Sequence, residues 1–355
     1  MDSAWLVNGK VVTPDGVTGA AVLIAGGRIA KVQRHAPRGR RTIDVRGAYV
    51  APGFIDLHVW GDPVTVSRYF AAHGTTAFLS AIGPEPSSKT GARLDALQQL
   101  KAWPGAACLG AHLEGPFLNP KRGGALPKRW MRRPTTASLN ALAARGGIRM
   151  LTLAPELPGA MQAIRWCRGK GIIASLGHTD ADARTAARAV AAGARAVTHV
   201  FNAMRPFHHR APSLLEVALT DPRLTTMVIL DQVHVSAVAL RLLVRTKGPE
   251  RIVLVTDSIR HEGWDVRQRR GAYYLKSGTL AGSGLTMMRA VRHAVEQGGV
   301  TVAEAVRMAS EVPARLLRDR SRGKIAAGSR ADVVVFDSKF QVRLTVVGGR
   351  IVYER

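Results

Sequence analysis

The feature that most constrains this fold is a long alternation of short apolar runs with helix-like stretches. Eight runs have the length of buried strands, at 54–59, 76–80, 107–113, 149–153, 172–176, 196–198, 226–230 and 251–255. Helix-like stretches follow most of them, at 64–73, 88–100, 136–145, 159–169, 181–192, 213–219 and 235–244, and two more lie at 287–296 and 301–310. Eight strand–helix units in series favour a closed parallel barrel over an open doubly wound sheet. We therefore predict an α/β fold with a (β/α)₈ TIM-like barrel over residues 53–322.

Both ends of the chain are predicted to be β-structure. Two dipeptides in the first fifty residues, Asn8-Gly9 and Gly26-Gly27, lie between short apolar runs and indicate hairpin turns. Gly348-Gly349 has the same setting near the C-terminus. Neither end is long enough to form a stable sheet alone. We therefore expect residues 1–52 and 323–355 to combine into one small β-sandwich.

The chain is strongly basic, and this charge must be weighed against possible partners. Lys and Arg number 51 against 25 Asp and Glu, so the formal net charge is +26. Such an excess can indicate nucleic acid, an anionic membrane or an anionic substrate. The basic residues are scattered, with only short clusters, and aromatic residues make up 5%, too few for an array of base-stacking platforms. We expect a dispersed surface charge that at most steers a small anion, with no nucleic-acid partner.

The cysteine content, the apolar runs and the first residues of the chain together indicate in which cellular compartment the protein resides. Cys108 and Cys167 are too few for a disulfide framework or a paired-cysteine metal site. No apolar run reaches the ~18 residues of a membrane span. The first residues lack the basic segment and apolar stretch of a signal peptide. We expect a cytoplasmic protein that does not bind a membrane.

Metal-capable or acid–base side chains recur just past the predicted strands, where the active site of such a barrel lies. They are His58, Glu114, His178, His199, His234 and Asp257. A single His after a strand is usually a structural residue whose hydrogen bonds are satisfied. Six suitable residues at matching positions favour a metallohydrolase.

Glu114, His178 and His199 form the best candidate metal site. One carboxylate and two imidazoles are a recurring catalytic zinc set that leaves a position open for water. A metal there lowers the pKa of its water to ~7, and Asp257 could accept the proton and return it to a leaving group. The alternative for Asp257 is a helix N-cap.

The segment 202–210 directly follows His199 and carries Asn202, two His and two Arg. At the mouth of a barrel, such a loop could bind an anion. Arg210 suits a phosphate because its planar guanidinium presents paired donors. The alternative is an ordinary solvated loop.

Seven runs of the chain have a distinctive sequence: Ala51-Pro52-Gly53-Phe54-Ile55-Asp56, His112-Leu113-Glu114-Gly115-Pro116-Phe117, Leu153-Ala154-Pro155-Glu156, Gly177-His178-Thr179, Thr198-His199-Val200-Phe201-Asn202-Ala203-Met204, Val255-Thr256-Asp257 and Leu280-Ala281-Gly282-Ser283. These runs resemble the N-acetylglucosamine-6-phosphate deacetylases of the amidohydrolase superfamily. They extend over nearly the whole chain. The resemblance implies a barrel with a small β-sandwich, a homodimer, and hydrolysis of the N-acetyl amide of an amino-sugar phosphate, most simply N-acetylglucosamine 6-phosphate to glucosamine 6-phosphate and acetate.

The resemblance also implies roles for individual residues. Glu114, His178 and His199 would be metal ligands, and Asp257 would be the general base and acid. His234 would polarise the amide carbonyl or hold the substrate. The residues implied to face the sugar phosphate are Asn202, Ala203 and Arg210.

Three departures from the family pattern qualify this picture. Many amidohydrolases have two His at the end of the first strand, whereas this chain has His58-Val59-Trp60. An indole cannot ligate a cation, so we predict one divalent metal per chain, with zinc the first choice and iron or manganese as alternatives. His58 then becomes a substrate-contacting or supporting residue. Leu126 stands where the family usually has a substrate-contacting His, and Gln232 stands in place of a Gly.

Two rival functions remain open at this stage. A hydrolase of another N-acyl or amide substrate is one, although a cyclic-amide hydrolase usually needs a lysine where Pro155-Glu156 stands. A catalytically weakened basic binding protein on the same fold is the other. It would account for the charge, but not for the presence of all four core catalytic positions.

Overall fold

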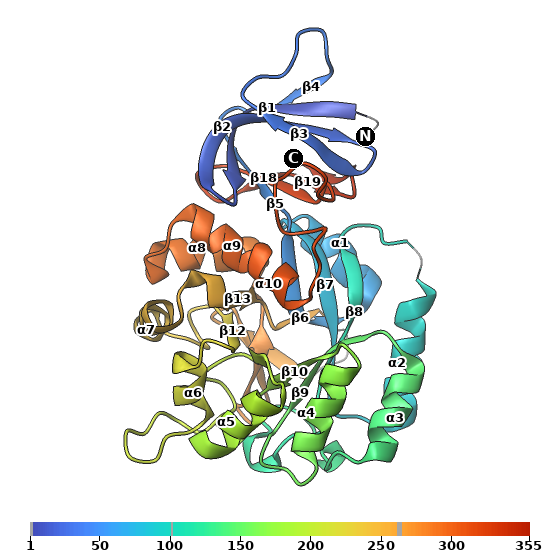
Figure 1. The fold of residues 1–355 in the computed structure, drawn as a ribbon, viewed down its shortest axis with the longest axis vertical. Coiled ribbons are helices and arrows are strands. Elements are labelled where there is room, and N and C mark those ends of the chain that lie inside the picture. The colour runs from blue at the N-terminus through green and yellow to red at the C-terminus, as the bar shows by residue number, and fades with distance from the viewer. Residues whose placement is uncertain (1–2, 101, 261–264) are drawn as a thin grey trace.

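The computed structural model describes residues 3–100, 102–260 and 265–355, so the predicted start of the small domain at residues 1 and 2 lies outside the described residues. A barrel surrounded by helices carries a separate β-sheet at one end, and both chain ends lie in that sheet (Figure 1). The prediction of a TIM-like barrel with a β-unit made from both ends is confirmed.

All eight predicted runs form strands, and neighbouring strands pair in parallel. They are β6 (Phe54–Gly61), β7 (Thr75–Ile82), β8 (Ala107–Glu114), β9 (Ile148–Leu153), β10 (Ile173–Leu176), β11 (Ala196–Val197), β12 (Thr225–Ile229) and β13 (Ile252–Val255). The ring closes through a short strand, β14 (Ser258–Arg260), which follows β13 and pairs in parallel with β6. Thr256 and Asp257 therefore lie at the seam between the last strand and the first.

Three antiparallel strands follow the seam, and the sequence patterns did not predict them. They are β15 (Val266–Arg269), β16 (Ala272–Leu275) and β17 (Leu280–Ser283). β17 returns to the barrel and pairs with β14 at Ser258 and Ser283. These three strands therefore border the mouth of the barrel beside Asp257.

Helices cover the outside of the barrel (Figure 1). They are α1 (Pro63–Ala71), α2 (Ser87–Gln99), α3 (Thr136–Arg145), α4 (Ala160–Gly169), α5 (Ala183–Ala192), α6 (Leu214–Thr220), α7 (Ala237–Lys247), α8 (Met287–Gly298), α9 (Val302–Ala309) and α10 (Glu311–Leu316). Local sequence explains several of their starts: Asp62 and Asp182 cap α1 and α5, and Thr301 with Glu304 forms a capping box at α9. No helix among the described residues is long and apolar enough to cross a membrane.

The small β-unit is one continuous sheet that encloses its own apolar core. Its strands are β1 (Ser3–Thr13), β2 (Gly16–Ala25), β3 (Arg28–Gln33), β4 (Thr42–Asp44), β5 (Tyr49–Pro52), β18 (Val333–Phe336), β19 (Val342–Val347) and β20 (Arg350–Glu354). β5 and β18 pair antiparallel and so join the two chain ends. The hairpins predicted at Gly26-Gly27 and Gly348-Gly349 are confirmed.

The hairpin predicted at Asn8-Gly9 is wrong. β1 runs straight through these residues and pairs with β2 on both sides of a bulge. Asn8 has a φ of 58°, and a Cβ on Gly9 would lie 2.7 Å from a methyl carbon of Val45 and of Val50. Asn8-Gly9 therefore forms a bulge against which other segments of the same chain pack closely. A bulge, like a turn, favours a residue that tolerates a positive φ and a residue without a Cβ.

Candidate active site at the barrel mouth

Glu114, His178 and His199 come together at the carboxyl ends of three barrel strands. Glu114 ends β8, and the two His lie two residues past β10 and β11. The Oε1 atom of Glu114 is 2.9 Å from Nε2 of His178 and 2.8 Å from Nε2 of His199. All three side chains are buried, and their ligand atoms lie within 4.8 Å of one another. This convergence is possible only in the folded barrel, because the residues are far apart in sequence.

The donor set fits a divalent metal. The Nδ1–H of His178 donates to the carbonyl of Arg122 over 2.8 Å, which leaves the Nε2 lone pair directed at the cluster. The Nδ1 atom of His199 is buried and has no hydrogen-bond partner among the described residues. Burial alone would raise the pKa of Glu114, but the neighbouring His58 and His178 hold that pKa well below its usual range. The carboxylate is therefore kept charged, as a ligand must be.

The backbone at these strand ends adopts conformations that side chains disfavour. His178, His199, Ala203 and Asp257 have φ angles of 49°, 29°, 53° and 47°. Left-handed non-glycine residues persist only where the surrounding structure enforces them, and they cluster at functional sites.

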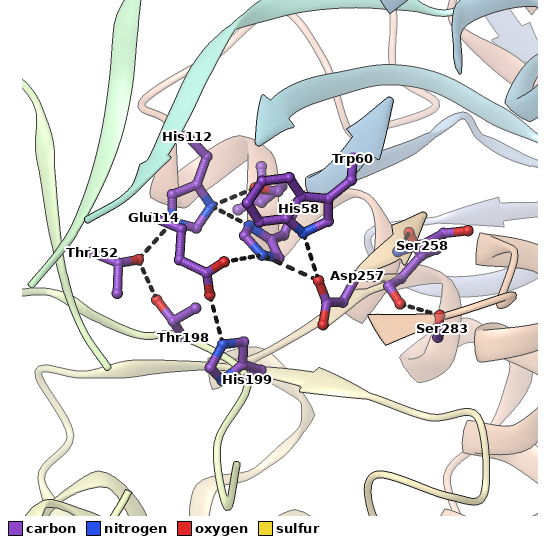
Figure 2. A network of polar contacts seen from close by, with 12 residues as sticks. His58, Trp60, His112, Glu114, Thr152, Thr198, His199, Asp257, Ser258 and Ser283 are labelled. Carbon is purple, nitrogen blue, oxygen red and sulfur yellow. Dashed lines mark hydrogen bonds and ion pairs between the residues drawn. The ribbon is translucent and has the colours of Figure 1, made fainter. Parts of the chain in front are cut away.

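Asp257 lies opposite the metal-ligand cluster, and two residues of β6 hold it (Figure 2). The indole Nε1–H of Trp60 donates to Oδ1 of Asp257 over 2.9 Å, and Nε2 of His58 is 3.3 Å from the same oxygen. His58 also lies 3.5 Å from Oε2 of Glu114. Burial opposes protonation of His58, but Glu114 and Asp257 outweigh it and raise its pKa to about 10. His58 thus bridges the two carboxylates.

His112 is a component of the site that the sequence reasoning missed. Its Nδ1 atom is 2.9 Å from both the carbonyl of Leu57 and Nδ1 of His58. Its Nε2 atom is 2.7 Å from the hydroxyl of Thr152, which continues to Thr198 over 2.7 Å (Figure 2). Burial lowers the pKa of His112 to about 3, so the ring is neutral. The signal was available, because His112 lies two residues before Glu114 and shares its face of β8.

His234 lies in the loop that follows β12. Its Nδ1 atom is 2.7 Å from Oδ2 of Asp231, whose other oxygen accepts from the backbone N–H groups of Val233 and His234. Burial alone would raise the pKa of Asp231, but the hydrogen bond and charge of His234 lower it. Gln232 stands between them with a φ of 71°. A glycine would adopt that angle without strain.

A cavity of about 200 Å³ collects most of the predicted site residues. Its lining includes Glu114, His178, His199, Asn202, Ala203, His234 and Asp257, together with Trp60, Leu126, Ile229 and residues 279–282. Leu126 packs against the buried cluster that contains Trp60, so this wall of the cavity is apolar. Two predicted residues do not line the cavity. His58 is fully buried behind it, and Arg210 is exposed, 3.0 Å from the ring of His209.

Glu156, which also follows a strand, has a structural role. It accepts from the side-chain amide of Asn119 over 2.8 Å, from the backbone N–H of Asp180 over 2.7 Å, and from the hydroxyl of Thr179. The carboxylate therefore ties together the loops after β8, β9 and β10. These loops carry or flank two of the three candidate ligands.

Comparisons with known proteins place the chain in a family. The sequence profile of the amidohydrolase family matches residues 49–352 of this chain. The chain belongs to the amidohydrolase family. Members of this family are metal-dependent, in agreement with the ligand cluster of Glu114, His178 and His199.

Individual relatives refine the placement of this amidohydrolase. It is 34% identical to the N-acetylglucosamine-6-phosphate deacetylase of Bacillus subtilis, over 93% of this chain and 92% of that protein. It is 36% identical to the N-acetylgalactosamine-6-phosphate deacetylase of Escherichia coli O157:H7, over 85% and 87%. The solved structure of a Mycobacterium smegmatis N-acetyl-D-glucosamine-6-phosphate deacetylase variant, in complex with N-acetyl-D-glucosamine-6-phosphate, superposes with a TM-score of 0.89 and 31% identity. That match covers 99% of this chain and 100% of the other.

Proposed function

We propose that this amidohydrolase removes the acetyl group from N-acetylglucosamine 6-phosphate, giving glucosamine 6-phosphate and acetate. The observation that carries the proposal is the cavity in which Asp257 faces the cluster of Glu114, His178 and His199. The chain shares this fold, at 31% identity, with a deacetylase solved in complex with that compound. A metal site and a carboxylate on one cavity are what amide hydrolysis requires.

Asp257 is proposed as the general base and acid. A metal held by Glu114, His178 and His199 supplies Lewis acidity and lowers the pKa of water to ~7. Trp60 and His58 both contact Oδ1 of Asp257, so we assign proton transfer to Oδ2. That oxygen takes a proton from the attacking water as the new carbon–oxygen bond forms. It then gives the proton to the departing amine nitrogen as the carbon–nitrogen bond breaks.

His234 is proposed to donate to the oxygen of the scissile carbonyl. Its Nδ1–H is engaged by Asp231, which leaves Nε2 as the ring atom for substrate. A ring that carries a proton on both nitrogens would donate from Nε2 to the developing negative charge. Asn202 and Ala203 line the same cavity and are proposed to contact the sugar phosphate together with Arg210.

Several finer assignments belong to the same proposal. We propose one divalent metal per chain, with zinc the first choice because a set of two imidazoles and one carboxylate suits it. Iron or manganese are the alternatives. We further propose a cytoplasmic homodimer, with the small β-domain formed by residues 1–52 and 323–355 and the barrel by residues 53–322.

A galactose-configured substrate is the second candidate, and the 36% identity to an N-acetylgalactosamine-6-phosphate deacetylase supports it. The test is a deacetylation assay of the metal-reconstituted protein on both N-acetylhexosamine 6-phosphates and on their unphosphorylated forms. We expect the highest kcat/KM for N-acetylglucosamine 6-phosphate. A higher value for the galactose epimer would change the substrate assignment. Acetate release from neither compound would reject the deacetylase proposal.

A further inference from the structure

A second cavity, remote from the catalytic one, is lined by five arginines. Its volume is about 260 Å³, and its lining residues include Arg168, Arg195, Arg223, Arg315 and Arg318. Arg195 directly precedes β11, and Thr225, which also lines the cavity, begins β12. The cavity therefore opens at the amino ends of barrel strands, whereas the proposed active site lies at their carboxyl ends. None of its lining residues is shared with the catalytic cavity.

The positive charge of this cavity is poorly compensated within the described part of the chain. No Asp or Glu is among the lining residues. Arg223 is paired with Asp221, at 2.6 Å between nitrogen and oxygen. Arg195 donates to the backbone carbonyls of Val190 and Ala194, and Arg315 donates to the backbone carbonyl of Glu250. For the guanidinium groups of Arg168 and Arg318 the structure gives no hydrogen bond or ion pair to any described residue. All five arginines are solvent-exposed, so their like charges repel one another only weakly through water and remain accessible to an anion.

We propose that this arginine cavity binds a small anion that carries two or more linked phosphate groups, such as a diphosphate or triphosphate. Guanidinium groups present paired donors that match phosphate oxygens, and several of them around one cavity match several phosphate groups better than one. The rest of the lining is Gly, Thr, Ile and Leu. Among the described residues it includes no aromatic side chain, so it lacks the platforms on which the bases of a single-stranded nucleic acid would stack.

The arginine cavity concentrates part of the net charge of +26 at one place on the molecule. It is independent of the deacetylase proposal, because no residue of the arginine cavity takes part in the proposed chemistry. Loss of deacetylase activity and loss of anion binding can therefore be observed separately in the same protein.

Isothermal titration calorimetry with tripolyphosphate at constant ionic strength tests the proposal on the full-length, metal-loaded protein. The site variant combines Arg168→Gln and Arg318→Gln, which removes two charges without breaking an internal bond of the described chain. The control variant combines Arg184→Gln and Arg188→Gln on α5, which removes the same charge from exposed positions outside the cavity.

We expect the site variant to raise the Kd for tripolyphosphate by at least ~10-fold, as for loss of charged hydrogen bonds, and the control variant to change it by less than about 2-fold. The deacetylase kcat should stay unchanged in both. Equal weakening in the two variants would show general charge attraction and overturn the proposal. So would the absence of binding to the unaltered protein, binding abolished by Arg210→Ala instead, or tighter binding of a single-stranded oligonucleotide through the same arginines.

Discussion

At the scale of single residues, Trp60 explains why this site differs from one with two imidazoles on the first strand. Its indole cannot ligate a metal, yet it donates to Asp257 over 2.9 Å from a nearly fully buried position. Trp60 therefore offers no ligand to a metal but orients Asp257, the proposed base. Together with Leu126, it also forms a bulky apolar wall of the cavity.

Trp60→Phe should lower kcat by roughly 10- to 100-fold, because a hydrogen bond to a charged carboxylate is lost. KM and metal content should change little. Trp130→Phe is the matched control, since Trp130 is not among the residues lining the catalytic cavity. An equal kcat loss in both variants would contradict the role given to Trp60.

Asp257→Asn should fold and bind metal but lose ~10²–10⁴-fold in kcat, because water loses its proton acceptor. Elemental analysis of the variant separates this effect from metal loss. Near-native turnover in the metal-replete variant would remove Asp257 from the proton transfer.

At the scale of elements, the seam of the barrel depends on the buried Asp56 in β6. Its Oδ1 accepts from the backbone N–H of His58 over 3.1 Å and of Thr256 over 3.2 Å, and its Oδ2 accepts from the hydroxyl of Thr256 over 2.5 Å. Asp56 therefore ties the first strand to the residue that precedes Asp257. Burial raises its pKa from 3.8 to about 6, although these hydrogen bonds oppose the shift.

The raised pKa of Asp56 predicts a pH-dependent stability. The folded chain holds this proton more tightly than the unfolded chain, so the contribution of Asp56 to the free energy of unfolding falls as pH rises from about 4 to about 6. The change from 3.8 to about 6 corresponds to about 3 kcal/mol. Asp56→Asn cannot titrate. As the pH rises from 4.5 to 7, the Tm of this variant should therefore increase relative to the Tm of the unaltered protein. A difference in Tm that stays constant across this range would refute the assignment.

The loop between β11 and α6 presents Arg210 on the surface, outside the lining of the catalytic cavity. If this loop reaches the sugar phosphate, from its own chain or from another copy, Arg210→Ala should raise KM for the phosphorylated substrate by ~10-fold or more. The unphosphorylated analogue should be almost unaffected. Arg184→Ala, on an exposed face of α5, controls for net charge. Equal effects on the two substrates would exclude Arg210 from phosphate recognition.

At the scale of the whole molecule, metal loading should couple to stability. The cluster of Glu114, His178 and His199 spans three strands, so a bound metal favours the folded state, by about 4 kcal/mol at a thousand times its Kd. Chelation should abolish activity and lower the Tm by several degrees, and re-addition of one equivalent of zinc per chain should restore both. Glu114→Gln should remove the response. Two tightly bound metals per active chain would show the count to be wrong.

The sequence by itself determined the periodic features of this protein. Alternating apolar runs and capped helices are local patterns, so the eight barrel strands and most helices could be predicted from them. Because parallel strands end at one face of a barrel, the positions of Glu114, His178 and His199 also predicted that they would meet. The pairing of the two chain ends followed from each being too short to form a sheet alone.

Only the tertiary structure decided which distant groups touch. The bulge at Asn8-Gly9, the hydrogen bond from Trp60 to Asp257 and the contact of His112 with His58 all depend on packing between strands that no local pattern encodes. The arginine cavity gathers residues from 168 to 318, which in the sequence are indistinguishable from other scattered surface charges. The physical reason is the same in each case: backbone preferences act over a few residues, whereas hydrogen bonds and charges act between whatever the closed barrel brings within a few ångströms.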